Sequence, residues 1–157
     1  MEQYFDVHII TQNIDDLHER AGSTNVLHLH GEILKVRSTF KDELYDWEKT
    51  DLKLGDKCPK GYQLRPHVVW FGESVPNMFE AANLCEDAAL LIVIGTSLNV
   101  YPAANILNFV PANCRKYLID PIKPVSFLGN NIQFIQKKAG EGTTALVRQL
   151  LSLEEKV

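Results

Sequence analysis

The chain has 157 residues, enough for one domain, and its hydrophobic content of 45% is ordinary for a globular protein that buries a core. A net charge of -4, with acids and bases interspersed, argues against binding to nucleic acid or to an anionic membrane. No apolar run is long enough to span a bilayer and the first residues do not form a secretory leader, so we expect a cytoplasmic protein.

The three cysteines are Cys58, Cys85 and Cys114, and no two of them form a Cys-x-x-Cys pair. An odd number with wide spacing does not indicate a disulfide framework. Cys85 and Cys114 stand in apolar stretches, where we expect buried, unreactive thiols.

Three short elements are predicted at the start of the chain. The β-branched run 7–11 predicts a strand. Acids at 15–16, with a glycine after the stretch, predict a short helix over 17–21. The alternating residues 26–30 predict a second strand.

Residues 32–64 differ in composition from the rest of the chain, because charged residues crowd the stretch and its hydrophobic periodicity is poor. We expect a small module here, inserted into a main domain formed by residues 1–31 and 65–157. The residues expected to pack it are Tyr45, Trp47, Leu52, Leu54 and Tyr62.

Strands and helices alternate regularly after the module. The predicted strands are 68–72, 90–94, 116–119 and 132–135, and the predicted helices are 78–87, 102–110 and 143–153. The continuous apolar run Leu90–Ile94 is typical of a parallel strand that is covered on both faces. Strands separated by helices predict an α/β fold with a doubly wound parallel sheet.

Polar residues and glycines gather where the predicted strands end. These ends are residues 11–13, 30–31, 71–73, 95–97 and 119–120. Parallel sheets of this class bind ligands at the carboxyl ends of their strands, so we expect a binding site there.

Each of these strand ends also has an ordinary structural interpretation. The stretch 95–97 can bind phosphate or ribose, or it can form only a tight turn. The stretch 12–15 can bind a ligand, or its polar residues can simply form a turn and cap a helix. His30 has the side chain of a base at neutral pH, but His28 lies on the same face of the strand, and position alone does not choose between them.

Four blocks of sequence together resemble the sirtuin signature. They are residues 11–22, 28–31, 64–73 and 95–104, which read TQNIDDLHERAG, HLHG, LRPHVVWFGE and GTSLNVYPAA. The resemblance is closest to the bacterial deacylases and covers nearly the whole chain, most weakly at 35–60 and after residue 122. It implies a Rossmann-like fold and an NAD-dependent protein-lysine deacylase, which moves the acyl group of a lysine onto ADP-ribose and releases nicotinamide.

The resemblance also implies which residues carry the reaction. His30 matches the general base that activates a ribose hydroxyl, with Asn13 and Asp15 as its catalytic neighbours. The positions that would bind NAD are Gln12, Asn13, Ile14, Asp15, Gly95, Thr96, Ser97 and Asp120. Asp120 stands where many sirtuins have an asparagine at the adenine ribose, and a carboxylate can accept hydrogen bonds from ribose hydroxyls.

An acyl-lysine protein or peptide is the substrate that the resemblance implies. The segment 68–73 resembles the edge that such a peptide joins as an added strand, a mode that tolerates many substrate sequences. The substrate-binding positions are Val69, Phe71, Gly72, Glu73 and Val100. Val69 and Phe71 match residues that line the acyl-lysine tunnel, although ordinary core packing is an alternative for both.

The sequence departs from the family pattern at its start. It contains no Gly-Ala-Gly-x-Ser loop, which binds the pyrophosphate of NAD in sirtuins. Three explanations are open: a truncated piece of a longer protein, a separate N-terminal segment, or self-association that covers the exposed sheet edge. A non-catalytic module that binds NAD, ADP-ribose or a partner is therefore the alternative to an enzyme.

The module also lacks the two Cys-x-x-Cys pairs with which many sirtuins hold zinc. Cys58 is its only cysteine, and Ser38 and Thr39 stand near the place of the first one. One thiolate cannot complete a tetrahedral Cys₄ site, so we predict no bound metal.

Overall fold

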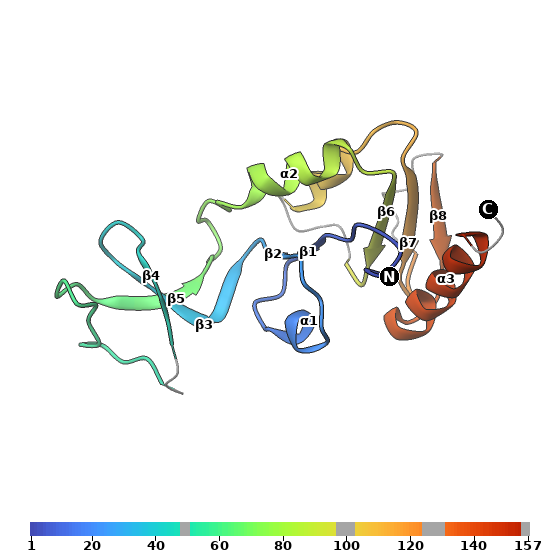
Figure 1. Cartoon of the computed structure of the whole chain (residues 1–157). Coiled ribbons are helices and arrows are strands. Elements are labelled where there is room, and N and C mark those ends of the chain that lie inside the picture. The colour runs from blue at the N-terminus through green and yellow to red at the C-terminus, as the bar shows by residue number, and fades with distance from the viewer. Residues whose placement is uncertain (48–50, 97–102, 124–130, 155–157) are drawn as a thin grey trace. The chain divides into compact units, whose positions relative to one another are not determined.

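The computed structural model describes residues 1–47, 51–96, 103–123 and 131–154 (Figure 1). The chain divides into two compact units. We call the first, formed by Met1–Val7 and Phe79–Val157, the terminal unit, and the second, His8–Met78, the middle unit. Among the described residues, no helix is long and apolar enough to cross a membrane.

The terminal unit is built on a three-stranded parallel sheet. Its strands β6 (Leu90–Ile94), β7 (Arg115–Ile119) and β8 (Ile132–Ile135) follow one another in the sheet in that order. The helices are α2 (Met78–Glu86), which begins at the boundary of the unit, the 3-10 helix η1 (Ala103–Asn108) and α3 (Ala139–Glu154). These are the strands and helices that the sequence predicts, although the helix expected at 102–110 is a shorter 3-10 helix.

One face of this sheet packs against α3 (Figure 1). Tyr117 and Ile119 lie on the same face of β7 and are buried together with Leu146 and Leu150 of α3. Spacings of two in a strand and four in a helix place each pair on one side of its element. These four side chains therefore form a core between the sheet and α3.

The helix α3 begins at Ala139, earlier than the start predicted at residue 143. Gly140 and Gly142 obscure this start in the sequence, because glycine is a poor helix former. Gly142 has a packing reason: a Cβ there would lie 2.3 Å from Cγ2 of Ile119, whose side chain is fully buried. A Cβ at Gly140 would meet nothing within 4 Å.

The middle unit contains two small sheets. In the first, β1 (Ile9–Thr11) pairs in parallel with β2 (Val26–His28), and α1 (Leu17–Arg20) connects them. In the second, β3 (Gly31–Ser38) lies between β4 (Leu44–Asp46) and β5 (Leu64–Val68), and both pairings are antiparallel. The sequence does not predict this antiparallel sheet, because the exposed Ile33 and Leu34 interrupt the alternation of β3.

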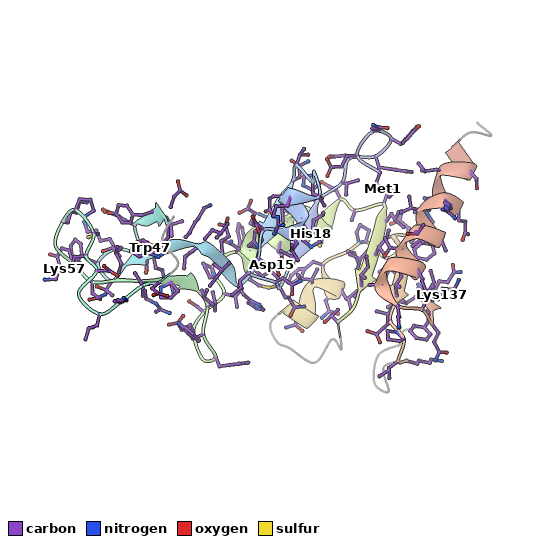
Figure 2. The ribbon with its side chains drawn as sticks, turned by 90° about the horizontal axis from the view of Figure 1, so that it is seen from below. Met1, Asp15, His18, Trp47, Lys57 and Lys137 are labelled. Atoms are coloured by element: carbon purple, nitrogen blue, oxygen red, sulfur yellow. The ribbon has the colours of Figure 1, made fainter. Side chains whose placement is uncertain are left out.

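The antiparallel sheet has its own small core, composed of Val36, Cys58 and Leu64 with Tyr45, Trp47 and Leu52 packed against them. Trp47 is labelled in Figure 2. The expected packing is wrong for Leu54, which is 96% exposed, and for Tyr62, which is exposed and stacks on the ring of Phe40. The domain boundaries predicted from the sequence stay a prediction.

All three cysteines are free and buried. Cys85 lies in α2 and Cys114 directly precedes β7. Burial raises the pKa of the Cys85 thiol. The inert thiols expected at these two positions are therefore in keeping with the structure.

The two glycines of α3 provide a stability test of the packing on β7. We expect Gly142→Ala to lower the free energy of unfolding by about 1–3 kcal/mol, because the new methyl group overlaps Ile119. Gly140→Ala is the control and should be neutral or stabilising by up to about 1 kcal/mol, since alanine favours the helix. Urea unfolding of both variants measures the difference, and equal midpoints would contradict the close contact.

Candidate functional site

The loop Gln12–Asp15, which we call the site loop, follows β1 and is held by a hydrogen bond at each of its four residues. The carbonyls of Gln12 and Asn13 accept from two histidine rings. The carbonyl of Ile14 accepts from the backbone N–H of Ile33 at 2.8 Å. Oδ1 of Asp15 accepts from the N–H of Leu17 at 3.2 Å and so fixes the start of α1, which carries His18 (Figure 2).

The side chain of Asn13 is left exposed by this arrangement. Its backbone N–H donates to Oγ1 of the buried Thr11 at 3.1 Å, and its carbonyl is bound as well. Residues 12–15 therefore do form a turn, which is the structural alternative that the sequence allows for this stretch. It also directs an amide side chain to the surface, where a ligand can meet it.

His30 is half-buried and binds the site loop through one ring nitrogen. Its Nδ1 lies 3.0 Å from the carbonyl oxygen of Gln12. A carbonyl only accepts, so Nδ1 carries a proton, and in the neutral ring the lone pair is then on Nε2. His30 thus has the tautomer that a general base needs.

His28 lies two residues earlier and has a different environment. Its Nδ1 is 3.0 Å from the carbonyl oxygen of Asn13, its Nε2 is 2.8 Å from Oε1 of Glu19, and the residue is 6% exposed. Both partners are acceptors, so both nitrogens donate. The geometry therefore separates the two histidines that the sequence leaves equivalent: His30 can present a lone pair, whereas His28 has both nitrogens engaged.

Gly31 allows the chain to pass directly from His30 into the antiparallel sheet. Its φ is +85°, and a Cβ would lie 2.0 Å from the carbonyl oxygen of His67 in β5. Gly31 pairs with Val68, and the N–H of Val69 donates to the carbonyl of His30 at 2.9 Å. The segment after β5 is therefore bonded to the backbone of the candidate base.

The strand predicted at 68–72 is displaced, because β5 ends at Val68 and residues 70–73 form a turn. The carboxylate of Glu73 holds this turn. It accepts from Arg65 at 2.7 and 3.1 Å, from Arg37 at 3.1 Å and from the N–H of Trp70 at 3.0 Å. The hydrogen bonds from Arg65 and Trp70, together with the charges of Arg65 and Arg37, lower the pKa of Glu73 to about 2.

Phe71 stands at this turn with its side chain fully exposed, while Val69 is half-buried. Core packing within the middle unit therefore does not account for Phe71. The sequence gives no local signal for the arginines that hold the turn, because Arg37 is far from Glu73 along the chain.

Gly95, Thr96 and Asp120 belong to the terminal unit. Parallel pairing of Ile94 with Ile119 makes these residues leave the sheet at the same carboxyl edge. Gly95 has φ +61°, a Cβ there would meet nothing within 4 Å, and its N–H donates to the carbonyl of Ile119 at 3.0 Å. Ser97 and Val100 lie outside the described residues. The sequence-predicted site residues thus form two groups, one in each unit.

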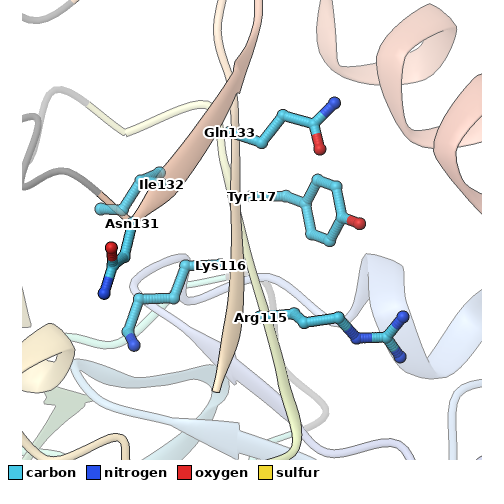
Figure 3. Close-up of a pocket in the computed structure, with 6 residues that line it drawn as sticks. All are labelled: Arg115, Lys116, Tyr117, Asn131, Ile132 and Gln133. Carbon is cyan, nitrogen blue, oxygen red and sulfur yellow. The ribbon is translucent and has the colours of Figure 1, made fainter. Parts of the chain in front are cut away.

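A hollow at the amino ends of β7 and β8 is lined by none of the site residues predicted from the sequence. Its lining residues are Arg115, Lys116, Tyr117, Asn131, Ile132 and Gln133. Figure 3 shows Arg115, Tyr117 and Gln133 on one side of the strands and Lys116 on the other. Nζ of Lys116 donates to the carbonyls of Pro111 and Cys114, so backbone carbonyls of the chain already accept hydrogen bonds from this ammonium group.

Within the described ranges, no three His, Cys, Asp or Glu side chains gather where they could hold a metal ion. Sγ of Cys58 lies 3.5 Å from Oγ of Ser38, and both residues are buried. The hydrogen bond with Ser38 lowers the pKa of the Cys58 thiol. The absence of zinc from the module stays a prediction.

Residues 2–102 of the chain match the model of the Sir2 family. The chain belongs to the Sir2 family. Among its relatives, an NAD-dependent protein deacylase of Helicobacter pylori is 49% identical over 154 residues, which are 98% of this chain and 67% of the relative.

Solved structures of Sir2 proteins confirm the Rossmann-like α/β fold. A mutant Sir2 homologue in complex with ADP-ribose has a TM-score of 0.84 and 38% identity, and the match covers 98% of this chain and 64% of that protein. A Sir2 structure with 2'-O-acetyl-ADP-ribose and a deacetylated peptide has a TM-score of 0.74 and 30% identity, covering 94% of this chain and 66% of that one. The chain spans about two thirds of the length of these proteins.

The close approach at Gly31 can be tested against a glycine of nearly equal φ. Gly31 and Gly61 have φ of +85° and +84°, but a Cβ at Gly61 would meet nothing within 4 Å. Both alanine variants carry the left-handed backbone strain, and Gly31→Ala must also separate β3 from β5. We expect it to lower the free energy of unfolding by about 1–3 kcal/mol more than Gly61→Ala in urea unfolding. A smaller loss in Gly31→Ala than in Gly61→Ala would contradict the contact with His67.

The Glu73 carboxylate predicts a stabilising contribution that is lost in acid. Since the folded state lowers its pKa from 4.5 to about 2, the contribution is complete above 4.5 and disappears as the pH falls toward 2. Glu73→Gln should therefore show a flatter loss of stability over this interval than the wild type. The exposed Glu86 provides the control variant Glu86→Gln, which should follow the wild-type curve in acid unfolding.

Proposed function

We propose that this chain carries the base and the peptide-binding part of an NAD-dependent protein-lysine deacylase. The enzyme would move the acyl group of a lysine to ADP-ribose and release nicotinamide. Its Helicobacter relative is named an NAD-dependent protein deacylase, and the chain covers 67% of that protein. The observation that carries the proposal is the 3.0 Å contact between Nδ1 of His30 and the carbonyl of Gln12.

His30 would act as the general base. The carbonyl of Gln12 fixes the ring and its tautomer, so that Nε2 can take the proton of a ribose hydroxyl. Bound NAD supplies the leaving group and the acceptor for the acyl group. Because the ring is half-buried, it remains accessible to such a ligand.

The residues of the site loop fit a sugar and an amide. Asn13 presents an exposed carboxamide, which can donate and accept at once. Gln12, Ile14 and Asp15 belong to the same loop, and Asp15 also anchors α1. We propose Asn13 and Asp15 as the catalytic neighbours of His30, and the whole loop as the wall around the ribose and nicotinamide.

Cofactor contacts are also proposed for residues of the terminal unit. Gly95 leaves open space where a side chain would otherwise stand, so a ligand can approach its backbone. Thr96 follows it, and Asp120 leaves the neighbouring strand at the same edge. We propose these residues, together with Ser97, as the ribose and phosphate contacts.

An acyl-lysine peptide would bind along the segment that follows β5. The N–H of Val69 donates to the carbonyl of His30, so a peptide strand bound along this segment would lie next to the proposed base. Glu73 holds the turn, and Gly72 has φ +89°. The exposed Phe71 would cover the acyl-lysine side chain. Val100, which lies outside the described residues, is a further proposed substrate contact.

A further segment or a second copy of the chain would complete the cofactor site. We base this on the length of the relatives, of which the chain spans about two thirds. The assay below therefore includes the chain alone and the chain joined to the remaining third of its Helicobacter relative.

Replacing His30 tests the proposed base. Glutamine at position 30 can still donate to the carbonyl of Gln12 but cannot take a proton at neutral pH, so His30→Gln should reduce turnover by about 100-fold or more. ADP-ribose affinity should remain nearly unchanged. Nicotinamide released from NAD with an acetyl-lysine peptide measures turnover, and calorimetry measures binding.

His18→Gln is the matched control, because His18 is a half-buried histidine of α1 in the same unit. It should retain wild-type turnover. If the chain alone and the chain joined to the remaining third of its relative both bind ADP-ribose without releasing nicotinamide, the chain is a non-catalytic binding module. Full turnover by His30→Gln would exclude His30 as the base.

A further inference from the structure

The two histidines at the end of β2 bind consecutive carbonyls of the site loop. Nδ1 of His30 contacts the carbonyl of Gln12, and Nδ1 of His28 contacts that of Asn13, each at 3.0 Å. Only His28 continues to a third element, since its Nε2 lies 2.8 Å from Oε1 of Glu19 in α1. The His28 ring therefore connects α1, β2 and the site loop.

A neutral imidazole cannot make both His28 bonds. It has one N–H, whereas the carbonyl of Asn13 and the carboxylate of Glu19 both require a donor. The residue is 6% exposed, so water has little access to replace a lost bond. Loss of one ring proton would leave two acceptors facing each other inside the protein, which is unfavourable.

We propose that His28 is a positioning residue, whose imidazolium links Glu19 to the carbonyl of Asn13 and so holds the site loop in the form that binds the cofactor. This inference rests on the proposed function, because it assigns a requirement for protonation to the same site. Both ring nitrogens of His28 are bonded within the protein, to Glu19 and to the carbonyl of Asn13. Its effect passes through the backbone of Asn13.

The groups around His28 favour the charged ring. Glu19 faces it from α1, Glu32 adds a negative charge from β3, and the side-chain amide of Asn77 donates to the His28 carbonyl at 2.8 Å. Burial lowers the pKa of His28, but the hydrogen bonds with Glu19 and Asn13 and the two negative charges raise it above 6.5 in sum. The hydrogen bond with His28 in turn lowers the pKa of Glu19.

The sign of the pH dependence follows from this direction. Because folding raises the pKa of His28, the charged ring stabilises the folded arrangement of the site loop. This stabilisation is complete below the unfolded pKa of 6.5 and is lost as the pH rises through the folded pKa of His28. Affinity for ADP-ribose should therefore fall on the alkaline side. The affinity should decrease over the pH range in which His28 loses its proton, while the protein remains folded.

Glu19→Gln separates the proton from the geometry. A glutamine amide can donate to the lone pair of Nε2, while Nδ1–H of a neutral His28 still donates to Asn13. This variant should keep the site loop in place without an imidazolium. His28→Gln removes the three-way link, and His18→Gln is the control, a histidine change next to Glu19 that leaves the link intact.

The experiment combines ring-nitrogen NMR, amide exchange of the site loop, and calorimetry with ADP-ribose between about pH 6 and pH 9. We expect both ring nitrogens of His28 to be protonated in the wild type near neutral pH, and only Nδ1 in Glu19→Gln. Wild-type and His18→Gln affinity should fall with the His28 titration, whereas Glu19→Gln should stay flat. His28→Gln should expose the loop amides and weaken binding about tenfold.

A singly protonated His28 in the wild type, or an equal pH dependence in wild type and Glu19→Gln, would overturn the proposal. If neither the chain alone nor the chain joined to the remaining third of its Helicobacter relative binds ADP-ribose, the proposed function fails. The NMR and exchange measurements still decide the positioning role in that case, because neither requires a ligand. A fully unfolded His28→Gln leaves the comparison with Glu19→Gln as the deciding one.

Discussion

The arrangement of the candidate site depends on the hydrogen bonds between two histidine rings and the carbonyls of Gln12 and Asn13. These bonds connect the end of β2 to the end of β1, which are already adjacent through the pairing of Thr11 with His28. Buried backbone carbonyls need partners, and here side chains supply them where the strand ladder ends. The same bonds fix the tautomer of His30 and favour the charged ring that we propose for His28.

Much of the fold was accessible from the sequence, because its signals are local. Leu90–Ile94 is apolar throughout and forms β6, and residues 132–135 form β8 as predicted. The segment after His67 was predicted less well. Its β-branched residues predict a strand, yet the chain turns after Val68 because Glu73 draws Arg65, Arg37 and the Trp70 N–H together. Arg37 is distant in the sequence, so no short-range pattern marks this contact.

The site shows the same division between local and distant information. A strand ending in His30 and Gly31 can be recognised as a ligand-binding edge, and the site loop can be recognised by its amides and acid. The choice between His28 and His30 could not be made, because alternation puts both on one face. The bond from Glu19 to His28 and the deeper burial of His28 distinguish them in the structure. Likewise Leu54 looks like a core residue by composition but is 96% exposed.

Gly31 sets a distance as well as a backbone angle. With only a hydrogen atom between its Cα and the carbonyl of His67, β3 and β5 approach more closely than any side chain would allow at that point. His30 directly precedes Gly31, and Val69 directly follows β5. The close approach of Gly31 to His67 therefore sets the distance between His30 and a strand added at Val69. The distance from His30 to the lysine of a peptide bound as we propose would therefore depend on the missing Cβ of the neighbouring Gly31.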